Sequence, residues 1–169
     1  MKNVFGLGLM AMLVACGGGK NLRAGGAGDE TPAWVAQGSG AFSVESGKKL
    51  QGVGVARESN PRERRAAADS SARRQLQGSV DALAVLLGKM SESTKVNVGD
   101  DISALARKAA AASPQVRDHF VTGAGAESAL DQIELAAFKQ ALQSADGDEG
   151  LKKEMGNNTD RAFDQLARQ

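Results

Sequence analysis

Residues 60–90 carry the feature that most constrains the fold, the signature of one long amphipathic helix. Asn60 can cap a helix, Pro61 suits the first helical position, and Glu63 stands where a capping box has its acceptor. Apolar residues then recur at steps of three and four, at Ala72, Leu76, Val80, Leu83, Ala84 and Leu87. A helix running to about Met90 is about 45 Å long. This length exceeds what a small domain needs, which favours a role in self-association or in binding a partner.

A β-hairpin is predicted ahead of this helix, over residues 41–56. Apolar and polar residues alternate on both sides of a turn predicted at residues 46–49. Gly52 and Gly54 fall on the same face of the second strand, which indicates that a side chain or a helix packs closely over bare backbone there.

The remaining sequence predicts further helices and strands. A helix begins at Asp100 or Asp101, and residues 93–99 suit either a short strand or a loop. The other predicted elements are a helix to Ala112, strands at 116–121 and 129–135, a turn at 122–126, a helix at 136–142, a break at 146–148, and a last helix interrupted at 156–158. Together they predict an α+β fold in which a small antiparallel sheet packs against one long helix, with additional C-terminal helices. We expect a single domain over residues 32–169.

Charge and composition exclude several classes of function. The 169 residues include 21 basic and 20 acidic side chains, so the net charge of +1 gives no general attraction to nucleic acid. One Cys cannot form an internal disulfide framework, and one Cys with one His cannot build a structural zinc site. We therefore expect no cofactor, no bound metal, no nucleic-acid partner and no small-molecule substrate.

The N-terminus has the composition of a targeting segment. Residues 4–13 are all apolar or Gly, a run too short to cross a bilayer core of about 30 Å permanently. Leu13-Val14-Ala15-Cys16 resembles the lipobox of bacterial lipoproteins. The resemblance implies a signal peptide over residues 1–15, diacylglyceryl transfer to the Cys16 thiol, cleavage before Cys16 and acylation of the new amino group. The alternatives are an ordinary signal peptide or a buried helix that happens to carry a Cys.

A Gly-rich segment follows Cys16. Residues 16–31 contain almost no bulky apolar side chains, so they predict a flexible tether between the lipid and the domain. In lipoproteins of diderm bacteria a residue other than Asp directly after the lipidated Cys implies delivery to the outer membrane, and here that residue is Gly17. We expect the chain on the periplasmic face of that membrane. Trp34, the one Trp of the chain, stands at the start of the domain. It is either a core anchor or part of a binding surface.

Arginines crowd the first half of the long helix, among them Arg62, Arg65 and Arg73. They form either a solvated helix face, partly neutralised by Glu63 and Asp69, or a contact with anionic lipid head groups or lipopolysaccharide. With Trp34, these three arginines are the candidate residues for contact with the membrane or with a partner.

Three stretches are similar to the Lpp-twenty family of outer-membrane lipoproteins, which includes lipoproteins of flagellar basal disks. They are residues 32–35, residues 52–56 leading into a helix with Ala68, Ala72 and Arg73, and residues 133–138 with Ala162 and Phe163. The resemblance implies an α+β module in which an antiparallel sheet wraps a long helix, and it implies no enzymatic activity. The Ala-rich stretch near 100–112 departs from the family pattern and leaves the order of the later strands open.

The residues themselves also give no specific catalytic signal. His119 is the one imidazole, and it stands in a predicted strand where we expect it to be half exposed rather than a general base. We expect a non-catalytic, lipid-anchored envelope protein with a structural or protein-interaction role, through self-association or a partner in the envelope. The alternative is an accessory lipoprotein that regulates peptidoglycan synthesis or envelope assembly.

Overall fold

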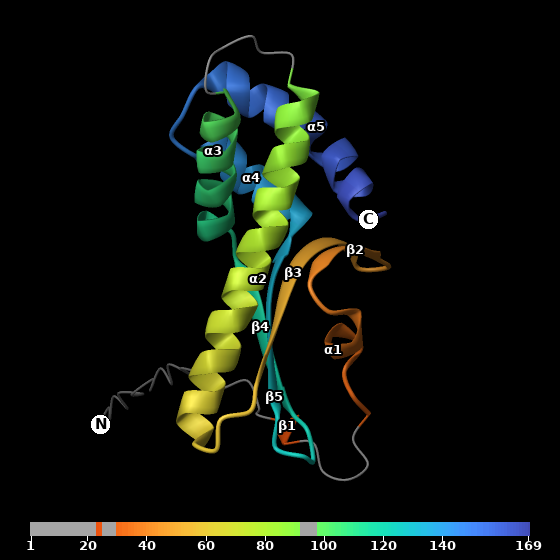
Figure 1. Cartoon of the computed structure of the whole chain (residues 1–169). Coiled ribbons are helices and arrows are strands. Elements are labelled where there is room, and N and C mark those ends of the chain that lie inside the picture. Colours follow the sequence, from red (N-terminus) through yellow and green to blue (C-terminus); the bar gives the residue numbers. More distant parts are fainter. Residues whose placement is uncertain (1–22, 25–29, 92–97) are drawn as a thin grey trace, which may run out of the picture.

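A computed structural model of the chain describes residues 23–24, 30–91 and 98–169 (Figure 1). The signal peptide, Cys16 and most of the predicted tether lie outside the described residues. The elements are β1 (Arg23–Ala24), α1 (Ala33–Gln37), β2 (Gly40–Val44), β3 (Gly47–Ala56), α2 (Pro61–Met90), α3 (Val98–Ala112), β4 (Gln115–Val121), β5 (Glu127–Glu134), α4 (Leu135–Ser144) and α5 (Glu149–Leu166).

The strands form one sheet in the order β1-β4-β5-β3-β2. Neighbours from β4 to β2 are antiparallel, and the short β1 pairs in parallel with the end of β4. The predicted α+β fold is therefore confirmed: an antiparallel sheet, one long helix and further C-terminal helices. The strand order, which the sequence left open, puts β5 between β3 and β4.

The long helix α2 begins as the sequence predicts. The side-chain oxygen of Asn60 accepts hydrogen bonds from the backbone N–H of Arg62 at 2.9 Å and of Glu63 at 3.4 Å. The first half of α2 crosses the sheet, while its second half extends past the sheet and packs against α3 and α5 (Figure 1). All six residues of the predicted apolar stripe are buried.

The two halves of α2 are packed differently. Around the second half, Leu, Ile, Phe and Met side chains from the sheet and the helices form the main hydrophobic core, which includes Leu83, Phe138 and Phe163. Around the first half, the separate cluster of buried residues consists of alanines: Ala56, Ala68, Ala72 and Ala129. The helix therefore lies very close to the sheet in its first half.

Gly52 and Gly54 are the reason for this close approach. A Cβ atom at Gly52 would overlap the backbone of Ala72 and Leu76, and one at Gly54 would overlap the backbone of Ala68 and Ala72. The prediction that an element packs tightly over these glycines is confirmed, and that element is α2. The hairpin is also confirmed, although its turn comes earlier than predicted, at residues 45–46. Lys48 and Lys49, predicted in the turn, belong to β3 and pair with Ser43 and Phe42 of β2.

Two helices differ from the prediction in their extent. Residues 156–158 do not interrupt the last helix, since α5 runs through them. Met155 and Phe163 on either side are buried, and Thr159 donates a hydrogen bond to the Met155 carbonyl at 2.7 Å, so packing outweighs the weak helix propensity of Gly and Asn. Val98, predicted in a strand or loop, is the first residue of α3.

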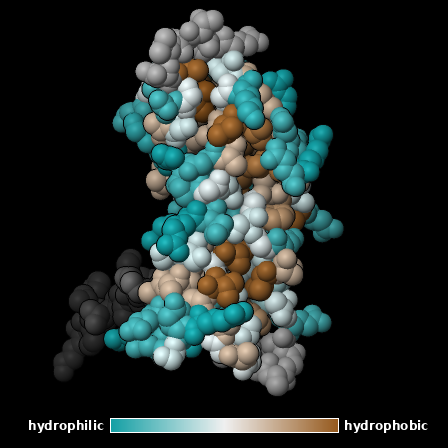
Figure 2. All heavy atoms as spheres, in the orientation of Figure 1, coloured by the Kyte–Doolittle hydropathy of each residue, from teal (hydrophilic) through white to brown (hydrophobic). Residues whose placement is uncertain are grey.

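The face of the sheet that points away from α2 is only partly covered. Figure 1 shows α1 on this side, and Figure 2 shows hydrophobic residues at the surface beside it. Val55 is 53% exposed and Val116 is 42% exposed. Within the described residues, no helix combines the length and apolar character that a membrane span requires.

Candidate functional site

A group of charged side chains lies between the first half of α2 and the sheet, and we name it the ion cluster. Two of its residues come from α2, two from β4 and two from β5. They are Arg64, Asp69, Arg117, His119, Glu127 and Asp131.

His119 lies at the centre of the ion cluster. Its Nε2 is 3.2 Å from Oδ1 of Asp69, and its Nδ1 is 3.2 Å from Oε1 of Glu127 without hydrogen-bond alignment. The side chain is only 13% exposed, so the expectation of a half-exposed strand residue is wrong. The reason is that β4 turns His119 toward α2, where Asp69 covers it.

Glu127 is an enclosed acid of the ion cluster that contacts both Arg64 and His119. Its side chain is 5% exposed, and its second oxygen, Oε2, is 3.6 Å from Nε of Arg64. The guanidinium of Arg64 also donates a hydrogen bond to the Glu58 carbonyl at 3.2 Å. Glu127 therefore links the helix to the sheet on one side and to His119 on the other.

Asp131 and Arg117 form the second part of the ion cluster. They are directly opposite in the β4–β5 register, and Nε of Arg117 is 3.6 Å from Oδ1 of Asp131. Burial raises the pKa of Asp131, because this effect outweighs the attraction of Arg117 and Arg73 for the carboxylate.

The strand register explains why these residues meet. His119 pairs with Ala129 and Val121 pairs with Glu127, so the imidazole and the Glu127 carboxylate are diagonal neighbours on the face that α2 covers. The small Ala129 leaves room for the ring. Sequence reasoning singled out His119 but missed Glu127, Asp131 and Arg117. Alternation within the two strands is not enough to place Glu127, Asp131 and Arg117 on the same face of the sheet. That step also needs the pairing register of β4 and β5.

The geometry of the ion cluster links α2 to β4 and β5 through His119. The two carboxylates at His119 lie against opposite nitrogens of the ring and so do not converge on one point. In the part of the chain that the structure describes, no group of three or more His, Cys, Asp or Glu could hold a metal ion. Both ring nitrogens of His119 face carboxylates, Nε2 that of Asp69 and Nδ1 that of Glu127.

The predicted contact residues occupy different environments. Arg62 and Arg73 are exposed, and Arg65 and Trp34 are half buried. Trp34 belongs to α1, which packs against β5 on the side of the sheet away from α2. The structure therefore groups the three arginines on α2 and separates Trp34 from them. Asp69 was expected to neutralise the arginines of α2 in part, but its carboxylate faces His119 instead.

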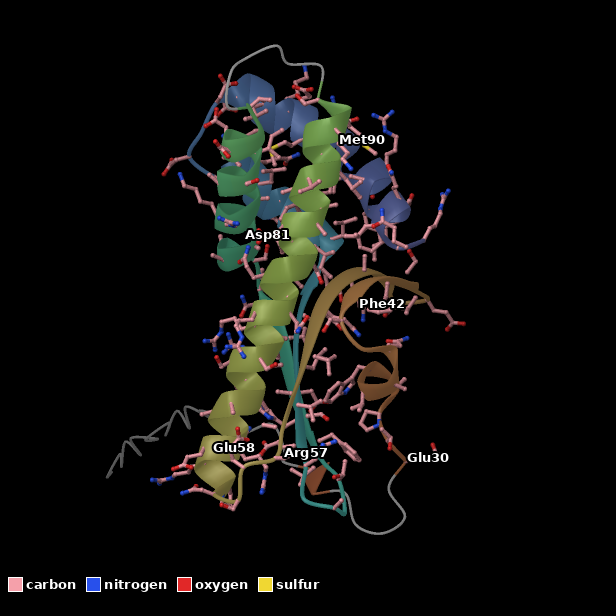
Figure 3. The ribbon with its side chains drawn as sticks, viewed as in Figure 1. Glu30, Phe42, Arg57, Glu58, Asp81 and Met90 are labelled. Atoms are coloured by element: carbon pink, nitrogen blue, oxygen red, sulfur yellow. The ribbon has the colours of Figure 1, made fainter. Side chains whose placement is uncertain are left out.

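A separate groove of about 660 Å³ lies at the other end of the molecule, where α2 ends beside α5. Met90, labelled in Figure 3, lines it together with Asp101 and Arg161. Nε of Arg161 lies 3.4 Å from the Met90 sulfur, and its NH2 group donates to Asn158 at 2.9 Å. This groove is polar and contains no His or Cys among its lining residues.

The buried carboxylate of Asp131 leads to a pH-dependent prediction. Since its pKa is raised in the folded state, ionised Asp131 opposes folding at neutral pH, and this opposition disappears as the pH falls below about 3.8. Asp131→Asn should therefore raise the thermal midpoint at pH 7 by ~2 °C, the shift that about 0.5–1 kcal/mol gives in a chain of this size. Thermal unfolding of the wild type and of Asp131→Asn between pH 7 and about pH 3.8 measures the difference between their midpoints. A lower midpoint at pH 7 would show that the pairing with Arg117 outweighs burial.

Comparison of the chain with protein-family models, with curated proteins and with solved structures finds no match.

Proposed function

We propose that this chain is a lipid-anchored envelope protein with a non-catalytic structural or protein-interaction role. The observation that carries the proposal is the lipobox-like sequence Leu13-Val14-Ala15-Cys16, which follows a short apolar run and precedes a Gly-rich segment and a folded domain. Attachment to the outer membrane on its periplasmic face is part of the proposal. The proposal also includes membership of the Lpp-twenty family. The resemblance implies an antiparallel sheet packed on a long helix, and the fold has this arrangement.

The ion cluster supports the non-catalytic part of the proposal. Its charges face each other between α2 and the sheet, and they cover a stretch of the interface where the apolar contacts come from alanines. Such an arrangement stabilises the position of the helix without presenting a free base or nucleophile to a substrate. The exposed Val55 and Val116 on the other face of the sheet support a surface for a second copy or a partner.

Lipidation is the decisive test. In cells supplied with labelled palmitate, the wild-type chain should incorporate the label and sediment with membranes, whereas Cys16→Ser should lose the label completely and leave the outer-membrane fraction. Ser43→Ala, at an exposed position in β2, serves as the control and should behave as wild type. An unlabelled wild-type chain, or a Cys16→Ser chain that is still labelled, would defeat the proposal. Crosslinking of the lipidated protein to a membrane synthase, rather than to copies of itself, would favour the alternative role in peptidoglycan synthesis.

A further inference from the structure

Three arginines on the first half of α2 form a stripe along one side of the helix. Arg62, Arg65, Asp69 and Arg73 follow one another at steps of three, four and four, so they lie along one side of the helix. Asp69 is the one acidic residue among them, and its carboxylate faces His119 on β4. The other three, which we name the arginine stripe, have no acidic partner within the described residues that is close enough for an ion pair.

The charge of this part of the molecule differs from that of the rest. Residues 57–74 contain six arginines against three acidic residues, whereas α3, α4 and α5 together contain six basic and six acidic side chains. Of the six arginines, Arg64 is paired with Glu127 inside the ion cluster. Figure 3 labels Arg57 and Glu58 in the connection from β3 to α2, at the end of the molecule opposite to α3, α4 and α5. Figure 2 shows hydrophilic residues at the surface of this end.

The chain enters the sheet beside the arginine stripe. Arg23 in β1 pairs with Phe120, the residue next to His119, and His119 contacts Asp69 in the middle of the stripe. Cys16 precedes Arg23 by seven residues. Because each residue spans at most ~3.6 Å, Cys16 lies no more than about 25 Å from this edge of the sheet. A lipid on Cys16 would therefore hold this basic side of α2 near the membrane surface.

We infer that Arg62, Arg65 and Arg73 bind the anionic head groups of phospholipids in the membrane that holds the Cys16 lipid. The contact rests on the lipidation proposed above and adds a second, electrostatic attachment. It orients the domain so that the first half of α2 faces the membrane, while the end formed by α3, α4 and α5 points away from it (Figure 1). Each arginine close to an anionic surface strengthens binding about fivefold, so the stripe contributes about 100-fold.

Vesicle cosedimentation tests the contact without the lipid. The chain starting at residue 16 and carrying Cys16→Ser is mixed with vesicles of phosphatidylcholine, either pure or containing phosphatidylglycerol. Binding is expected only to the vesicles with phosphatidylglycerol, and it should weaken as salt is added. The triple variant Arg62→Gln, Arg65→Gln, Arg73→Gln should bind about 100-fold more weakly.

The matched control removes three other exposed cations, through Lys89→Gln, Lys153→Gln and Arg168→Gln. It should bind within about threefold of the parent chain, because these residues lie outside the stripe. A third variant, with lysine at all three stripe positions, should retain binding and separates loss of charge from loss of folding. Equal binding to pure phosphatidylcholine, no binding to either vesicle, or equal losses in the two triple glutamine variants would overturn the inference. Because this chain has no lipid, these outcomes are independent of palmitate labelling at Cys16.

Discussion

Gly54→Ala is expected to lower the free energy of unfolding by more than about 3 kcal/mol, and Gly52→Ala by a similar amount. A methyl group at Gly54 would overlap the backbone of Ala68 and Ala72 and come within 2.7 Å of the Ser71 Cβ. Backbone atoms cannot rotate away as a side chain does, so α2 would have to move off the sheet. Chemical denaturation of the two variants, followed by circular dichroism, measures the loss.

Gly78→Ala provides the control for this experiment. Gly78 also lies in the middle of an element, α2, but a Cβ atom there meets nothing within 4 Å. The change should therefore raise stability by about 1 kcal/mol through helix propensity alone. If Gly54→Ala were as stable as wild type while Gly78→Ala behaved as expected, α2 could not lie against β3 as the structure has it.

These glycines also show how far the sequence predicts the fold. Alternation in the hairpin places Gly52 and Gly54 on one face, and the apolar stripe from Ala72 to Leu87 gives α2 its buried side, so the tight contact can be predicted from local patterns. The element that covers the glycines cannot be predicted in this way. The strand order and the register of β5 depend on pairing between residues that are far apart in the sequence. The same limit applies at residues 156–158, where the buried Phe163 keeps the helix continuous.

The candidate site was less predictable than the fold for a related reason. His119 stands out because it is the one His, but its partners come from α2 and β5. Glu127 and Asp131 resemble ordinary polar residues of a half-exposed strand until β5 is known to be buried on both faces. No pattern within β5 distinguishes them, because alternation cannot reveal that α2 covers a polar face of the sheet.

Glu127→Ala is expected to lower the free energy of unfolding by about 3 kcal/mol, because it leaves Arg64 and His119 enclosed beside α2 without the anion they share. Combining it with Arg64→Ala should cost less than the sum of the two single changes, since the double variant no longer buries an unpaired guanidinium. A double-mutant cycle from chemical denaturation at neutral pH measures this coupling. Glu45→Ala, at an exposed position in the β2–β3 turn, is the matched control and should stay within about 0.5 kcal/mol of wild type.

The same variants separate a structural ion cluster from a catalytic one. If the cluster only holds α2 on the sheet, the envelope phenotype of Glu127→Ala and of His119→Ala should follow their stability, and growth at lower temperature should restore both as the folded population recovers. A catalytic group behaves differently, because its removal abolishes activity in a chain that is still folded. A His119→Ala chain with the unfolding midpoint of wild type and a complete loss of function at every temperature would therefore contradict the non-catalytic proposal and make the imidazole between Asp69 and Glu127 a reacting group.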